Sequence, residues 1–326
     1  MSRRLRVWLP YFLFSIFCFL PCALCAQEAG QEVVANLAAG RVVIFVAKDG
    51  IAIAANESHI EADSRPPLVA QLSGKRIAIL LGAVEWVLPA SGRPPLRLDF
   101  ELPRAIAPLT GGARLQQEQA SDLEPIGTAL LEPLRTVVPQ LTRKMDLAPE
   151  ESLVEMLVVG YEEQYGPEVW LLKYRLAQEP LRGDFWRSRV LRPSYTQLYP
   201  PEKGQPRTLV EVRYPPEESA PALLDLFQQS DARLTPLRTS NVQVARASEK
   251  LARGESNKAL LDDAVVFLRA SLDAIAQPDT LQIVAVIKET RGFEWILAPP
   301  AALQQKAEDV KPREPGAPSL RKKPPQ

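Results

Sequence analysis

The clearest pattern in the chain is a pair of short apolar runs at residues 42–55, separated by Lys48-Asp49-Gly50. An Asp-Gly pair favours a tight hairpin turn, because glycine adopts positive φ without steric strain. Residues 42–46 are apolar at every position instead of alternating, which is typical of a strand covered on both faces. The hairpin therefore predicts a layered domain with structure on each side of a sheet.

Three further strand pairs are expected from similar patterns. Each combines apolar, often β-branched residues with a polar or glycine-containing turn, a composition that favours hairpins. The pairs are 68–72 with 77–82, 153–161 with 168–176, and 281–288 with 293–297. Between the second and third hairpins, the Pro- and Gly-rich residues 88–112 predict a long loop.

Two other stretches, 122–143 and 259–276, have apolar residues at helical spacing and predict amphipathic helices. Pro133 should kink or divide the first helix, because proline removes a backbone donor and its ring clashes with the preceding turn. Many prolines interrupt residues 178–240, which we interpret as an insertion or irregular region of the domain. Within it, 208–214 favours a strand and 222–229 a short helix.

The first 26 residues are predicted to be a signal peptide. Arg3, Arg4 and Arg6 precede an apolar run, and small residues lie near Ala23 and Ala26, where a signal peptidase would cleave. This predicts export to the periplasm or to the outside of the cell. The alternative is an uncleaved membrane anchor, since the run is about long enough to span a bilayer. All three cysteines lie in this run, so cleavage would leave a domain without disulfides.

Composition sets the remaining boundaries and narrows the range of partners. We expect a short N-terminal lead at 27–41, one domain at 42–300, and a disordered tail rich in Pro and Lys at 303–326. The chain has 39 basic and 39 acidic residues, which argues against nucleic acid as a partner. No membrane contact is expected beyond the signal segment.

Three segments together carry a family resemblance. Residues 43–56 end in Lys-Asp-Gly-Ile-Ala-Ile-Ala-Ala-Asn, residues 157–171 contain Gly-Tyr-Glu-Glu-Gln-Tyr-Gly-Pro, and residues 263–295 combine a helix with a hairpin. In this order they resemble the proteasome-type subunits of the N-terminal nucleophile (Ntn) hydrolase superfamily. The resemblance implies an α+β fold, a four-layer αββα sandwich, here with the irregular insertion.

The resemblance also implies where a catalytic site would lie. In that family an N-terminal threonine, activated by its own α-amine, attacks the peptide bond, and two aspartates and a lysine support it. Matched residue by residue, these positions fall at Gly40, Asn56, Val69 and Lys173. None carries the family's side chain, and residues 27–41 contain no Ser, Thr or Cys. We therefore assign no catalytic residue and expect a degenerate site.

A second candidate site is a surface for a protein partner. Arginine and aromatic residues are interspersed through 182–214, a composition enriched at binding hot spots. The candidate residues are Trp186, Arg189, Tyr195 and Tyr199. The alternative, an edge hairpin whose aromatic side chains pack on the core, is the commoner arrangement for any one of them.

No metal or cofactor is expected. His59 is the only histidine, so neither a His-rich metal site nor a Cys–His pair can form in the mature chain. No Gly-rich phosphate loop is present either.

The leading hypothesis is an exported, non-catalytic protein of the proteasome-subunit type that acts as a binding or assembly module, with a protein partner or a homo-oligomer. One alternative is a hydrolase with a relocated site at Glu57, Ser58 and His59. Another is a structural subunit of an oligomeric ring. Cleavage before Cys25, which would leave an N-terminal thiol, is a further route to activity.

Overall fold

The structure is a computed structural model. It describes residues 33–57, 65–88, 94–110, 123–145, 147, 151–162, 165–216, 221–276 and 280–300. The predicted signal peptide, most of the N-terminal lead, the tail at 303–326, Ser58 and His59 lie outside these residues. Among the described residues, no helix combines the length and apolarity needed to cross a membrane.

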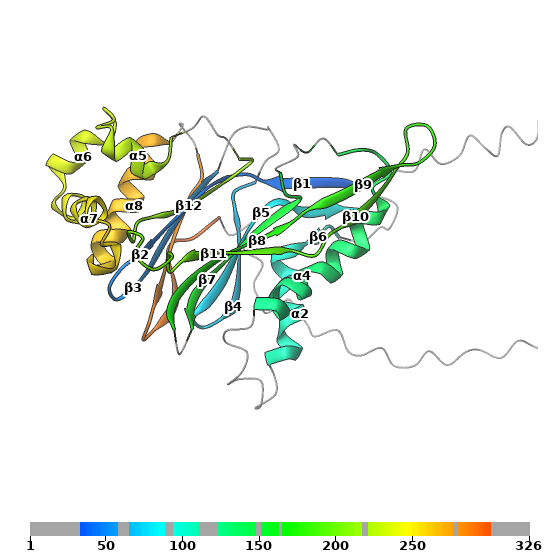
Figure 1. Ribbon diagram of the computed structural model, residues 1–326, viewed down its shortest axis with the longest axis horizontal. Helices are drawn as coiled ribbons and strands as arrows, with labels where there is room; N and C mark the ends of the chain where they lie inside the picture. The colour runs from blue at the N-terminus through cyan, green and yellow to red at the C-terminus, as the bar shows by residue number, and fades with distance from the viewer. Residues whose placement is uncertain are drawn as a thin grey trace, which may run out of the picture.

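The largest sheet has seven antiparallel strands in the order β1-β5-β7-β8-β11, with β4 and β6 also paired to β5 (Figure 1). Its strands are β1 (Val34–Ala38), β4 (Leu68–Ser73), β5 (Arg76–Val87), β6 (Leu96–Arg97), β7 (Val154–Glu162), β8 (Gly166–Tyr174) and β11 (Ser194–Tyr199).

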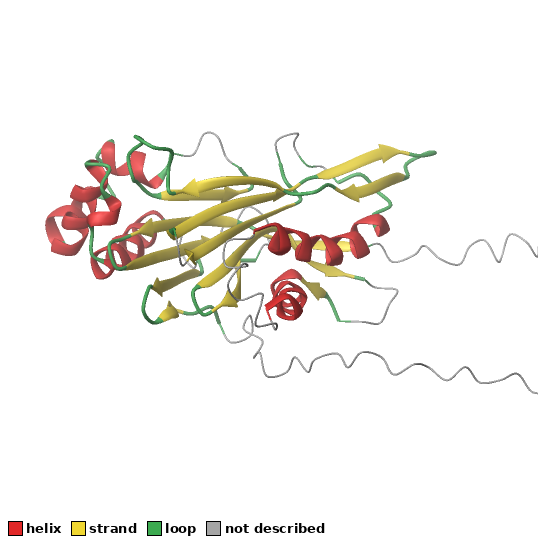
Figure 2. Ribbon diagram, turned by 60° about the horizontal axis from the view of Figure 1, so that its bottom comes forward, coloured by secondary structure: helices red, strands yellow, loops and turns green. Residues whose placement is uncertain are grey.

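A second sheet has five antiparallel strands in the order β12-β2-β3-β13-β14. They are β2 (Gly40–Val46), β3 (Gly50–Glu57), β12 (Val210–Tyr214), β13 (Gln282–Lys288) and β14 (Gly292–Leu297). The third sheet is a two-stranded ribbon of β9 (Leu176–Pro180) and β10 (Trp186–Val190). We call this ribbon and its turn the β9–β10 arm, and it projects from the body where β8 ends (Figure 2).

The helices gather at opposite ends of the molecule. On the seven-stranded sheet lie α2 (Leu98–Thr110) and α4 (Leu123–Val137), followed by the 3₁₀ turn η2 (Val138–Gln140). On the five-stranded sheet lie α5 (Leu223–Gln228), α6 (Thr235–Ser240), α7 (Val242–Ala252), the 3₁₀ turn η3 (Ser256–Lys258) and α8 (Leu261–Ile275).

The fold class expected from the family resemblance, a four-layer αββα sandwich, is wrong. Among the described residues β structure predominates, with 42% strand against 30% helix, and these residues form three antiparallel sheets with few helices. The β9–β10 arm has no counterpart in a four-layer arrangement. The strands that the sequence did not predict lie where prolines occur and polar and apolar residues are mixed. This hides the alternation with a period of two by which a strand is recognised in a sequence.

The hydrophobic core explains why the two larger sheets pack together. One buried cluster lies between them and is built from β-branched and leucine side chains such as Val42, Ile44, Ile79 and Leu157. Val43 and Phe45 point the other way and pack under α8. A strand with buried side chains on both faces must be apolar at every position, so the continuous apolar run at 42–46 is explained.

Several predicted elements are confirmed and one is wrong. All four predicted hairpins form, as do the strand at 208–214, the short helix at 222–229 and the helix at 259–276. Where a loop was expected at 88–112, the described residues 96–110 form β6 and α2. Of the two effects expected of Pro133, division of the helix does not occur, because α4 continues to Val137.

Candidate functional site

Gly40 begins β2 at the point where the chain passes from one large sheet to the other. β1 ends at Ala38 in the seven-stranded sheet, and β2 begins two residues later in the five-stranded one. The residues ahead of Gly40 are therefore part of the seven-stranded sheet, and Gly40 lies at the crossover between the two sheets.

The space around Gly40 is also closed. Gly40 is buried, and a Cβ atom built on it would run into the backbone carbonyl oxygen of Asn56. The same Cβ would lie 3.2 Å from Pro67 Cδ. A threonine side chain cannot be accommodated here without moving the backbone of β3.

The other three positions matched to the family site are spread over three strands. Asn56 lies opposite Arg41 in the β2–β3 pair, and its Oδ1 is buried with no hydrogen-bond partner among the described residues. Val69 lies in β4 and packs against the core between the sheets. Lys173 lies in β8 opposite Glu155.

Lys173 is held in an ion pair. Its Nζ lies 2.9 Å from Glu155 Oε1, and the Glu155 side chain is only 3% exposed. The ammonium and the carboxylate offset each other's charge, so each limits the energy lost when the other is taken out of water. The arrangement holds β7 to β8 at a sheet end and supplies no nucleophile.

Tyr214 joins the two large sheets near Gly40. It lies opposite Gly40 at the end of β12, and its hydroxyl donates a 2.9 Å hydrogen bond to the carbonyl oxygen of Ser152, ahead of β7. A Cβ on Gly82 would lie 3.1 Å from Tyr214 Cζ, so the ring fits against bare backbone there. Gly82 has φ +86°, which also favours glycine.

We expect Tyr214→Phe to lower the free energy of unfolding by about 1 kcal/mol, because it leaves a buried carbonyl without its donor. Urea unfolding followed by fluorescence measures the change. Tyr165→Phe is the matched control, since Tyr165 is 71% exposed and its loss of a hydroxyl should have little effect. Equal effects of the two substitutions would contradict this role of Tyr214.

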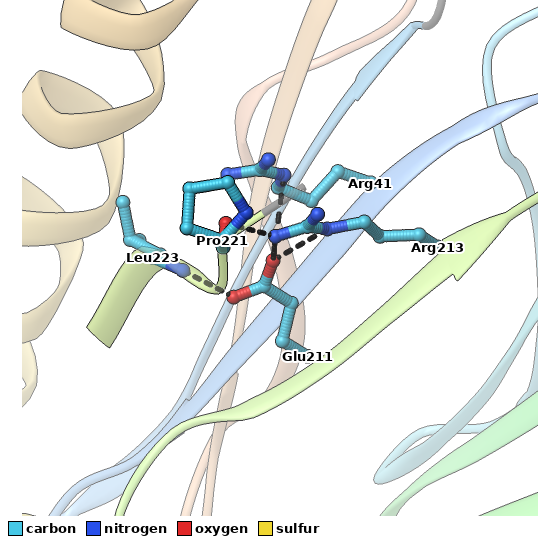
Figure 3. Close-up of polar contacts among 5 residues, drawn as sticks. All are labelled: Arg41, Glu211, Arg213, Pro221 and Leu223. Carbon is cyan, nitrogen blue, oxygen red and sulfur yellow. Dashed lines mark hydrogen bonds and ion pairs between the residues drawn. The ribbon is translucent and has the colours of Figure 1, made fainter. Parts of the chain in front are cut away.

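A charged network lies on the helix-covered face of the five-stranded sheet (Figure 3). Glu211 Oε1 lies 3.4 Å from Arg41 Nε and 2.6 Å from Arg213 Nη2. Glu211 Oε2 accepts a 2.7 Å hydrogen bond from the backbone N–H of Leu223 in α5. Arg213 also donates to the Pro221 carbonyl. Both carboxylate oxygens are thus engaged, so the network fastens edge strand β12 to α5.

The sequence analysis did not single out Arg41 or Glu211, and it included Arg213 only as one arginine of the stretch 182–214. Residues 210–214 alternate Val-Glu-Val-Arg-Tyr, so the pattern places Glu211 and Arg213 on one face of a strand. The pattern does not show that β12 pairs with β2, and this pairing places Arg41 opposite Arg213.

The predicted partner surface is divided by the structure. Arg189 is exposed on β10, and Tyr195 on β11 is 38% exposed. Trp186 is half-buried, with Lys144 Nζ 5.8 Å from its ring centroid. Tyr199 is 3% exposed and packs between the sheets. It therefore does not contribute to an exposed surface.

Tyr199 is held in place by both burial and charge. Burial raises the pKa of its phenol, while Arg207, whose Nη1 lies 3.4 Å from the hydroxyl, opposes the rise. The Arg207 guanidinium also lies 5.8 Å from the ring centroid. The contact between Tyr199 and Arg207 ties the end of β11 to the connection that leads to β12.

The most exposed apolar side chains of this region were not among the candidate residues, although Phe185 belongs to the arginine- and aromatic-rich stretch 182–214. Leu181 and Phe185, at the tip of the β9–β10 arm, are 53% and 62% exposed. The Leu181 N–H donates a 2.9 Å hydrogen bond to the Phe185 carbonyl, which closes the turn, and Gly183 adopts φ +65° within it. The sequence did contain a signal for them, namely two large apolar residues that flank Arg182-Gly183-Asp184.

The described residues offer little for metal or acid–base chemistry. No group of three or more His, Cys, Asp or Glu side chains in that part of the chain could hold a metal ion. Of the relocated site considered for a hydrolase, only Glu57 is described, at the end of β3. The described geometry brings no second reactive group to it.

No protein-family model matches the sequence, and a search of curated proteins finds no match either. The family resemblance therefore stays a prediction, and the function has to be argued from the residues of this chain.

Proposed function

We propose that this chain is an exported, non-catalytic binding module that engages a protein partner through the β9–β10 arm. The observation that carries the proposal is the arm tip, where Leu181 and Phe185 are both more than half exposed on a turn closed by a hydrogen bond. An ordered turn loses little conformational freedom on binding, so its apolar side chains can act as preformed anchors.

The charges beside the tip indicate the chemistry of the partner. Residues 175–192 contain five arginines but only Glu179 and Asp184 as acidic residues. Arg182, Arg187 and Arg189 are all exposed. The complementary surface is an apolar pocket for the tip, with Asp and Glu side chains at its rim.

The region around Gly40 supports the non-catalytic part of the proposal. The position matched to the family nucleophile is a buried glycine at the start of β2, and Lys173, which stands where the family has a supporting aspartate, is paired with Glu155. Position 40 carries no hydroxyl or thiol to act as the nucleophile of acyl transfer.

The parent chain is used for affinity capture from the exported proteins of the native cell. The double variant, Leu181→Ala with Phe185→Ala, then tests the arm. The captured partner is identified by mass spectrometry, purified, and titrated by calorimetry. We expect the double variant to bind it at least about ten-fold more weakly, because truncation removes both anchors. Its stability should change by less than about 0.5 kcal/mol, because both residues are exposed.

Val242→Ala is the matched control, since Val242 is 64% exposed on α7, away from the arm. A partner that binds the double variant as tightly as the parent would contradict the role of the arm. Covalent labelling of the mature N-terminal residue by a hydroxyl- or thiol-directed inhibitor would overturn the non-catalytic assignment.

A further inference from the structure

The outer strand β11 leaves one edge of the seven-stranded sheet open. β11 pairs only with β8 and ends the strand order on that side. Its residues Ser194–Gln197 are all exposed. Among the described residues, no hydrogen bond reaches Thr196 or Gln197 from outside the β8 ladder. An outer strand in this state presents a row of backbone donors and acceptors to solvent.

Other outer strands are protected against pairing. β12 carries Glu211 and Arg213, and β14 carries Glu294, charges that disfavour edge-to-edge contacts. β1 is capped by the backbone of Arg65, whose N–H donates 2.8 Å to the Leu37 carbonyl.

β4, like β1 and β11, contains no charged residue. It is covered differently, because α2 packs along it, and only Gln71 and Ser73 in it are exposed. β11, in contrast, has four consecutive exposed residues and no charged residue between Pro193 and Pro200. It is the least protected of these edges.

We infer that β11 pairs with β11 of a second copy of this chain, antiparallel, about a two-fold axis at Thr196. Such an axis is perpendicular to the sheet, so both copies present the same face of the sheet on the same side. Residues paired across the axis must therefore come from the same face. Thr196 opposite itself meets this condition, and so does Tyr195 opposite Gln197.

The strand fits itself in length and chemistry. Pro193 bounds the pairing at one end and the register irregularity between Gln197 and Tyr199 bounds it at the other. All the facing side chains are uncharged, so no like charges meet, and a threonine opposite a threonine is a favourable cross-strand pair. The two seven-stranded sheets would join into one continuous sheet. The inference uses a different surface from the arm tip and goes beyond the proposed partner binding.

Substitutions at the two-fold axis test the inference. Analytical ultracentrifugation of the full chain over a wide concentration range should show a reversible dimer. Thr196→Lys and Thr196→Glu should each raise the dimer dissociation constant about ten-fold or more, because like charges then lie directly opposite each other. An equimolar mixture of the two variants should recover dimers, since every mixed pair sets Lys against Glu.

Gln71→Lys on β4 is the matched control and should leave the dimer intact. Circular dichroism checks that every variant keeps the strand content of the parent. A parent chain that stays monomeric, a dimer unaffected by Thr196→Lys, or one lost through Gln71→Lys instead, would each overturn the inference. None of these results would remove the arm as a partner-binding element, which is tested by its own variants.

Discussion

Gly40→Thr, which places the family's nucleophile in the chain, is expected to lower the free energy of unfolding by about 3 kcal/mol and to give no peptidase activity. The added Cβ would run into the Asn56 carbonyl oxygen and approach Pro67. Both neighbours are held by the backbone, so neither can rotate away. Activity is not expected because Asn56, Val69 and Lys173 stand where the family has its supporting aspartates and lysine.

Urea unfolding and a fluorogenic peptide panel measure the two effects. Gly74→Ala is the matched control, since a Cβ on that turn glycine meets no atom within 4 Å. We expect its unfolding midpoint to stay close to that of the parent. A Gly40→Thr variant as stable as Gly74→Ala would show that the start of β2 can open, and would weaken the argument against catalysis.

Glu211→Ala is expected to destabilise the protein by about 3 kcal/mol. The substitution removes the carboxylate that faces both Arg41 and Arg213, whose side chains are only 17% and 14% exposed. It also leaves the Leu223 N–H without its acceptor. Removing one member of a largely buried ion pair is destabilising mainly because the remaining charges stay out of water.

Thermal unfolding of two further variants tests this explanation. Glu211→Gln retains an oxygen acceptor for Leu223 and should recover part of the lost stability. Glu294→Ala breaks a pair with Lys288 in which the carboxylate is 54% exposed, so its effect should be much smaller than that of Glu211→Ala. If both alanine variants unfolded at the same temperature, the network at Glu211 would not fasten β12 to α5 as described.

The elements that could be predicted from sequence are those with a strong local period. The hairpin at 42–55 shows this, because two apolar runs and an Asp-Gly turn are all local features. The helix α2 was missed because prolines precede it and Pro103 and Pro108 lie inside it. The β9–β10 arm was missed because its strands are short, half exposed and mixed in polarity.

The candidate sites depend on contacts that no local pattern contains. Sequence matching identified Gly40 as a position without a nucleophile, but the closed space there depends on the β2–β3 pairing. Tyr199 and Arg189 belong to one arginine- and aromatic-rich stretch, yet the first packs between the sheets and the second faces solvent. The register of distant strands decides between these outcomes.

The arm and the open edge of β11 belong to one ribbon. β8 leads through Arg175 into β9, and β10 leads through Leu191 into β11, with the Leu191 N–H bonded to the Arg175 carbonyl at 2.9 Å. A partner that changes the twist of the arm would therefore act on the strand that we infer to pair with a second copy. Reciprocity of linked equilibria then requires that partner affinity and dimer affinity change by the same factor. The ribbon would then couple two binding events, the partner at the arm tip and the second copy at β11.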